Sequence, residues 1–231
     1  MISKEQGLDH LAKGFDQLNI QLPSSEALDQ LWQYFTELLK WNSKINLVAK
    51  GPELELLENH FLDSFTMVPI VQKYLQEEPS HSLLDIGSGA GFPGLVLKIA
   101  CPDLPVTLVE PRQKRTAFLR HIARTLNLEK VTILAERVNK DDQQFTQKHG
   151  HFSLITCRAL TSIQEFLEMI GQIAALDAKI LFMKGPKAKD ELRAWRTQPD
   201  CFEVTSSSSL TLPFSGATRT LIVFTKTNGP Q

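Results

Sequence analysis

The chain has 231 residues, 42% of them hydrophobic, which is enough to bury one substantial core and a small second one. Its formal net charge of -1 excludes a globally basic nucleic-acid-binding protein, although it permits local basic surfaces. Three widely spaced cysteines, Cys101, Cys157 and Cys201, argue against a disulfide framework or a metal site and favour a cytoplasmic protein. No apolar segment reaches the roughly 18 residues that span a bilayer, so we expect no membrane association.

The first sixty residues are predicted to be helical. Apolar residues recur at helical spacing from Ser24 to about Lys40, behind serine residues that can cap a helix. We expect a shorter amphipathic helix before this one and another after the Gly-Pro pair at 51–52. The chain therefore divides into an N-terminal helical segment, residues 1–62, and a second domain, residues 63–231.

Short β-rich runs alternate with helical segments from residue 80 onward. The runs are SLLDI, VTLVE, VTILA, FSLIT and KILFM, and helices are expected over 112–127 and 162–175. This alternation predicts an α/β fold in which parallel strands are joined by helical crossovers, as in Rossmann-like sheets. The last run, 221–226, follows no helix, so we expect it to pair antiparallel with a strand near 202–205. The serine run 206–209 is predicted to be a turn or loop.

Residues 83–94, LLDIGSGAGFPG, combine a strand, a glycine turn and the start of a helix. This arrangement lets the backbone approach a nucleotide closely, and residues 89–94 match GxGxxG. Asp85 ends the strand, where a carboxylate would oppose a pyrophosphate and attract the cationic S-adenosylmethionine. Glu110 ends the next strand, where it can accept hydrogen bonds from both ribose hydroxyls. The alternative interpretation is that Asp85 only caps the turn and Glu110 is a solvated strand end.

The stretch DIGSGAGFPG is followed by VTLVEPRQKRTAFLR, AERV and ITCRAL, and this series resembles the bacterial small-subunit ribosomal RNA guanine-N7 methyltransferases. That family was formerly called glucose-inhibited division protein B. The resemblance extends to WNSKINLVA and NHFLDSF before the sheet and to MKG and Arg219 near its end. It implies a class I methyltransferase fold, S-adenosylmethionine as the cofactor, and small-subunit ribosomal RNA or a ribosomal subunit as the partner of a monomeric enzyme.

The resemblance also implies roles for particular residues. The cofactor site is expected to contain the glycine turn, the ribose-binding acid and the segment that frames the adenine: Asp85, Gly87, Gly89, Gly91, Phe92, Glu110, Glu136, Arg137, Val138 and Asn139. Arg158 is expected to belong to the cofactor site as well and to reach the reaction side, where it would contact the substrate or the cofactor; the alternative is a purely structural salt bridge. Lys184 and Arg219 are further candidates for positioning the RNA through its phosphates. Family members often carry an acid at the position of Asn139 and an aromatic residue at that of Leu160.

Guanine N7 carries a lone pair and no proton, so its methylation needs positioning and no general base. The histidines form no metal or acid-base pattern, and His60 is expected to be structural. Basic residues outnumber acidic ones by 6 to 2 within 110–130, a net charge of +4, and by 5 to 2 within 184–196, a net charge of +3. These two surfaces suggest docking on RNA phosphates.

Two other functions remain open from the sequence. A nicotinamide-dependent oxidoreductase would use the same glycine turn for a pyrophosphate, although Asp85 argues against it. A non-catalytic RNA-binding protein would retain the fold without the reaction.

Overall fold

A computed structural model of the protein describes residues 1–140, 142–195 and 201–228. The N-terminal part is helical: α1 (Lys4–Gln17), α2 (Ser25–Asn42), α3 (Glu53–Leu56), the π-helix η1 (Leu57–Leu62), α4 (Asp63–Phe65) and α5 (Val68–Glu77). Strands and helices then alternate: β1 (Leu83–Ile86), α6 (Gly94–Ala100), β2 (Val106–Val109), α7 (Gln113–Thr125), β3 (Val131–Leu134), α8 (Gln143–His149), β4 (Phe152–Cys157), α9 (Ile163–Ile170), β5 (Ala174–Lys184), α10 (Ala188–Trp195), β6 (Phe202–Thr211) and β7 (Thr218–Lys226).

The first two helices begin at serine residues that cap them. The side chain of Ser24 accepts a hydrogen bond from the amide of Ala27 at 3.2 Å, which satisfies a free donor in the first turn of α2. Ser3 and Gln6 form a reciprocal capping box at the start of α1. The predicted helices in this segment are confirmed.

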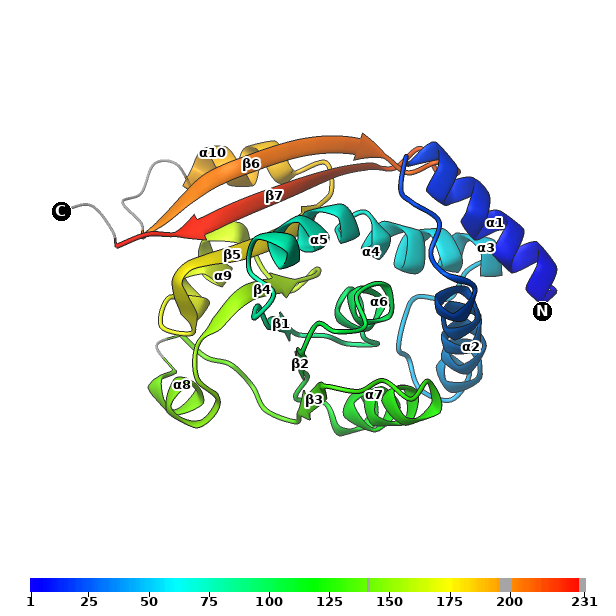
Figure 1. Ribbon diagram of the computed structural model, residues 1–231, viewed down its shortest axis with the longest axis horizontal. Helices are drawn as coiled ribbons and strands as arrows, with labels where there is room; N and C mark the ends of the chain where they lie inside the picture. Colours follow the sequence, from blue (N-terminus) through cyan, green and yellow to red (C-terminus); the bar gives the residue numbers. More distant parts are fainter. Residues whose placement is uncertain (141, 196–200, 229–231) are drawn as a thin grey trace.

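The seven strands form one sheet in the order β3-β2-β1-β4-β5-β7-β6 (Figure 1). Strands β1 to β5 are parallel to one another, and β7 is antiparallel to both β5 and β6. The predicted fold class, a mostly parallel Rossmann-like sheet with an antiparallel end, is confirmed. In this order β2, β1 and β4 are adjacent and parallel, so their carboxyl ends lie side by side. Open α/β sheets bind ligands at such a place.

The sequence prediction was wrong in two places near the end of the chain. The serine run 206–209 is part of β6, not a loop, and pairs residue by residue with β7. These serines lie at the sheet edge, so polar side chains meet water while the backbone completes the hydrogen-bond ladder with β7. The helix expected over 162–175 ends at Ile170, and residue 174 already begins β5.

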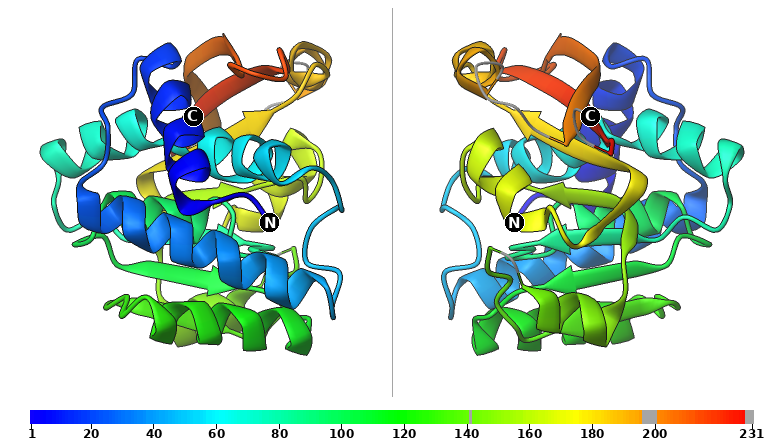
Figure 2. Two further views of the ribbon diagram at one scale, coloured as in Figure 1. Left: turned by 90° about the vertical axis from the view of Figure 1, so that its right-hand side faces the viewer. Right: turned by 90° about the vertical axis from the view of Figure 1, so that its left-hand side faces the viewer.

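Helices cover both faces of the sheet. Helices α1, α2 and α5–α7 pack on one face in a single hydrophobic cluster, and α8–α10 pack on the other. Figure 1 shows these layers, and the left view in Figure 2 looks onto α1 and α2 in front of the strands. The N-terminal helices therefore share a core with the sheet, and the boundary at residue 62 stays a prediction.

Candidate active site

A cavity of about 740 Å³ lies at the carboxyl ends of β1, β2 and β4. The glycine turn after β1 forms its floor, and Glu110 and Arg158 line it from the neighbouring strands on either side. The segment after β3 and the imidazole of His60 on η1 complete the lining. The glycine turn and Glu110, predicted to bind the cofactor, thus line the same cavity as Arg158.

The glycine turn has backbone angles that suit glycine. Gly87 has a φ of +75°, and Gly91 has a φ of +93°. A side-chain carbon at residue 91 would lie 2.6 Å from the hydroxyl of Tyr34 and equally close to Leu95. Gly91 therefore allows the turn to pack tightly against helices, whereas Gly87 and Gly89 line the cavity.

Aromatic side chains from the N-terminal helices support this turn from behind. Phe92 lies parallel to Tyr34 at a ring-centroid distance of 5.3 Å and meets Phe61 edge-on at 5.1 Å. The hydroxyl of Tyr34 donates a hydrogen bond to the carbonyl oxygen of Ala90. Helix α2 and η1 thereby fix the position of the turn.

Asp85 lies beneath the turn, fully buried, and is not among the described residues that line the cavity. Its Oδ2 accepts a hydrogen bond from the amide of Gly94 at 3.0 Å, at the start of α6, and its Oδ1 has no partner among the described residues. Burial raises the pKa of this carboxyl to about 7. The sequence suggested that Asp85 attracts a cationic ligand directly. Because Asp85 is buried beneath the turn and does not line the cavity, it makes no such contact.

Glu110 lines the cavity and is almost fully buried. Its Oε2 accepts from the amide of Gly89 at 3.1 Å, and its Oε1 accepts from the amide of Arg112 at 2.9 Å. The guanidinium of Arg115 is 3.6 Å from Oε2. Each carboxylate oxygen has a second lone pair, so Glu110 keeps the capacity to bind two hydroxyl groups.

The segment predicted to frame an adenine, 136–139, lines the cavity as a whole. Val138 is buried and presents an apolar surface, which suits the face of a purine. Glu136 forms an ion pair with Lys148 and a hydrogen bond with His149, both on α8, so its carboxylate anchors the segment to that helix. The backbone N–H of Asn139 donates to Oδ2 of Asp142 at 3.3 Å, and the Asn139 side chain is exposed.

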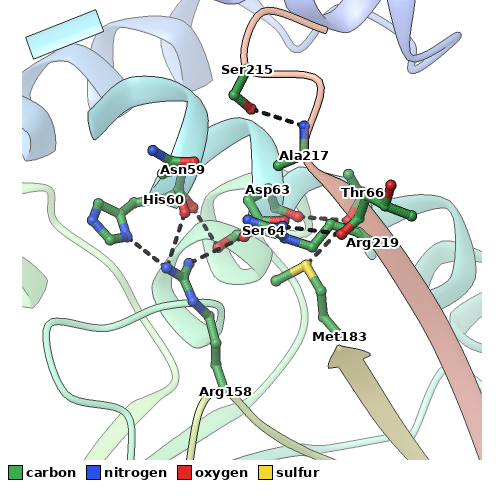
Figure 3. A network of polar contacts seen from close by, with 11 residues as sticks. Asn59, His60, Asp63, Ser64, Thr66, Arg158, Met183, Ser215, Ala217 and Arg219 are labelled. Atoms are coloured by element: carbon green, nitrogen blue, oxygen red, sulfur yellow. Dashed lines mark hydrogen bonds and ion pairs between the residues drawn. The ribbon is translucent and has the colours of Figure 1, made fainter. Parts of the chain in front are cut away.

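Arg158 is the centre of a polar network at the reaction side of the cavity (Figure 3). Its NH2 donates to the carbonyl oxygen of Asn59 at 3.0 Å and lies 2.7 Å from Nδ1 of His60. Its NH1 is 4.0 Å from Asp63 Oδ2 and has no hydrogen-bond partner in the described part of the chain. The guanidinium carbon lies 5.7 Å from the centre of the Phe92 ring. Arg158 therefore has a fixed position, and its NH1 is buried beside Asp63 without a hydrogen-bond partner among the described residues.

Two predicted positioning residues lie outside the cavity lining. Arg219 donates through Nε to Asp63 at 2.9 Å, on the far side of that carboxylate from Arg158 (Figure 3). Lys184 donates to the carbonyl oxygen of Thr161 at 2.8 Å and forms an ion pair with Glu191. Their contact with RNA stays a prediction.

His60 and Asp63 are the site residues that sequence reasoning missed. The motif NHFLDSF was part of the resemblance, but neither spacing nor composition indicated that it would meet the end of β4. Burial is the main cause that lowers the pKa of His60 to about 3, so its imidazole is neutral near pH 7. Burial raises the pKa of the Asp63 carboxyl, although its two arginines act in the opposite direction.

The charge of the cavity differs from the sequence prediction. The sequence prediction relied on the carboxylate of Asp85 to attract a cation, but basic side chains outnumber acidic ones in the cavity lining. The lining contains Glu110, Glu136, Arg112, Arg115, Arg137, Lys140 and Arg158. An excess of positive charge favours polyanions, so the selectivity for a cationic ligand cannot rest on the overall charge of the cavity.

Comparisons with known proteins identify the family. Residues 27–222 match the family model described as rRNA small subunit methyltransferase G. The chain belongs to this family. A relative from Desulfotalea psychrophila, named ribosomal RNA small subunit methyltransferase G, is 40% identical over 224 residues, which are 93% of this chain and 96% of the relative. A relative of the same name from Myxococcus xanthus is 35% identical and covers 94% of this chain and 96% of its own.

Solved structures show the same fold at low sequence identity. A mutant of MtNAS in complex with S-adenosylmethionine superposes with a TM-score of 0.52 and 13% identity, covering 86% of this chain and 72% of its own. TrmN from Thermus thermophilus has a TM-score of 0.51 and 14% identity, covering 78% of this chain and 55% of its own. The family member described here is therefore a methyltransferase with a class I fold. Among its described helices, none is long and apolar enough to cross a membrane.

Proposed function

We propose that this enzyme transfers the methyl group of S-adenosylmethionine to N7 of a guanine in small-subunit ribosomal RNA, as a cytoplasmic monomer. The family and the names of its members support the reaction class and the RNA. The observation that carries the proposal is the single cavity in which the glycine turn and Glu110 adjoin Arg158 and His60. One side of the cavity suits a nucleoside, and the other offers donors for a base.

The residues present fit the cofactor. Glu110 would accept hydrogen bonds from both ribose hydroxyls through its remaining lone pairs, and Val138 would pack against the adenine. Gly87 and Gly89 line the cavity without side chains, so the ligand would approach the backbone closely there. S-adenosylmethionine, when bound, supplies a methyl group activated by its positively charged sulfur.

The chain's own residues perform the rest of the reaction by positioning. Because N7 of guanine is unprotonated, no side chain has to remove a proton before attack. Arg158 lines the cavity and is held by Asn59, His60 and Asp63, so its guanidinium would donate to the base or to a phosphate from a fixed position. A rigid donor at this place would restrict the orientation of the guanine beside the cofactor.

Basic residues around the cavity provide the RNA contact. Arg112 and Arg115 belong to the basic stretch 110–130 and line the cavity, so that surface leads directly to the site. Helix α10 carries Lys189 and Arg193 of the second basic stretch, 184–196. Lys184 and Lys187 precede this helix, and Arg196 lies outside the described residues. Phosphate contacts made there would orient the RNA without reading its sequence.

Two measurements test the proposal. Titration calorimetry should show binding of S-adenosylmethionine and no binding of NAD. Incubation with isotopically labelled donor and either naked small-subunit RNA or intact subunits should then yield labelled 7-methylguanosine after digestion. Binding of NAD alone would instead support the oxidoreductase, and donor binding without transfer to either RNA substrate would support a non-catalytic protein.

A further inference from the structure

His60 is fixed between a charged donor and an aromatic ring. The NH2 group of Arg158 is 2.7 Å from Nδ1 of His60, and the imidazole stacks on Phe92 with centroids 5.1 Å apart and planes inclined by 26°. A guanidinium has only donors, so Nδ1 must accept this hydrogen bond. In the neutral imidazole the proton consequently resides on Nε2.

The surroundings of His60 keep its imidazole neutral, with the proton on Nε2. Burial and then the positive charge of Arg158 hold the pKa of the imidazole near 3, far below neutral pH. Arg158 cannot turn away, because Asn59 and Asp63 bind the same guanidinium from η1 and from the start of α4. The π-helical turn places Asn59 and His60 together against Arg158, a local irregularity that often marks functional sites.

The cavity thus contains an uncharged donor of fixed orientation next to Arg158. We propose that His60 determines base specificity by donating a hydrogen bond from Nε2 to the O6 oxygen of the target guanine. This inference rests on the proposed function. The major-groove edge of guanine carries only acceptors, N7 and O6, and N7 is taken by the incoming methyl group. Adenine presents an amino donor where guanine has O6, so it would oppose the Nε2–H donor and be rejected.

Nuclear magnetic resonance tests the tautomer without any RNA. In protein labelled with nitrogen-15 at histidine, Nδ1 of His60 should resonate as an unprotonated acceptor and Nε2 as a protonated donor. Neither signal should shift between about pH 5 and about pH 8, where an ordinary histidine titrates. A proton on Nδ1, or titration within this range, would overturn the inference.

Kinetics with an altered base test the contact itself. After the target guanine has been mapped, an RNA with 2-aminopurine at that position keeps N7 and lacks O6. His60→Asn keeps an acceptor for Arg158 but lacks the distal donor, so kcat/KM on the natural RNA should fall roughly tenfold. On the 2-aminopurine RNA, wild type and His60→Asn should be equally slow. The affinity for S-adenosylmethionine and the melting temperature should not change.

Control variants separate a specific role from a structural one. His60→Gln, whose amide nitrogen extends about as far as Nε2, should recover part of the rate on the natural RNA. The exposed His151 lies outside the cavity lining, and His151→Asn should behave as wild type. An equal loss by His60→Asn on both RNAs, or a weaker donor affinity, would refute the contact with O6. If wild type methylates no guanine, the proposed function itself is wrong.

Discussion

The phenol of Tyr34 donates its hydroxyl hydrogen to the carbonyl oxygen of Ala90, which joins helix α2 to the glycine turn. Tyr34 is fully buried, and its ring also lies parallel to that of Phe92. The N-terminal helices therefore do more than cover one face of the sheet. They set the shape of the turn that lines the cavity.

Tyr34→Phe should weaken binding of S-adenosylmethionine and destabilise the fold. The substitution leaves the carbonyl of Ala90 buried without its partner, which costs about 1 to 3 kcal/mol of unfolding free energy. Urea unfolding and calorimetry measure the two effects. Tyr74→Phe is the matched control, because its hydroxyl has no hydrogen bond in the described part of the chain. Equal behaviour of the two variants would show that the hydrogen bond from Tyr34 is unimportant.

Glu110→Ala should reduce the affinity for S-adenosylmethionine at least about tenfold, since each lost charge-assisted bond contributes about 1.5 to 3 kcal/mol. The substitution also frees the amides of Gly89 and Arg112, so the turn itself loosens. Glu110→Gln retains acceptor capacity and should lose less affinity. Unchanged affinity of the alanine variant by calorimetry would remove Glu110 from the cofactor site.

Arg158→Ala should abolish methyl transfer while the variant still binds S-adenosylmethionine. It should also lower the unfolding free energy by about 1 to 3 kcal/mol, because the carbonyl of Asn59 and one side of Asp63 lose their donor. Lys73→Ala, on the exposed face of α5 and outside both basic stretches, provides a control for the loss of one positive charge. A fully active Arg158→Ala enzyme would contradict the role of this residue in positioning.

Asp85 should make the stability of the enzyme depend on pH. Its pKa is about 7 in the folded protein and 3.8 ordinarily, so the folded state holds a proton that the unfolded chain has lost between these values. Stability should accordingly fall as the pH rises from about 4 to about 7 and then level off. Asp85→Asn cannot titrate and should lack this component of the slope. Identical pH profiles in urea unfolding would show that the carboxyl keeps its ordinary pKa.

Sequence patterns predicted the fold well because they follow from local burial. Alternation of β-rich runs and amphipathic helices predicted the parallel sheet, and the missing helix before 221–226 predicted its antiparallel end. The serine run 206–209 was assigned to a loop because low complexity says nothing about a backbone ladder. An edge strand such as β6 needs a hydrogen-bonding partner, here β7, more than it needs apolar side chains.

The sequence predicted those site residues that come directly after a strand. Glu110 and Arg158 directly follow β2 and β4, so topology alone brings them to the cavity. His60 approaches from the π-helix η1 and Asp63 from the start of α4, and their position depends on packing between distant segments. The side-chain direction of Asp85 likewise depends on packing, because the amide of Gly94 draws the carboxylate beneath the turn. The spacing of apolar residues in the sequence does not predict such contacts between distant segments.

The most direct test of the account is the methylation state of guanine N7 in small-subunit ribosomal RNA from cells that lack this enzyme. One 7-methylguanosine should disappear from the RNA of these cells. Wild-type enzyme should restore it, whereas Arg158→Ala, expressed at the same level, should not. Retention of every 7-methylguanosine in the deleted strain, or restoration by the Arg158→Ala variant, would contradict the account.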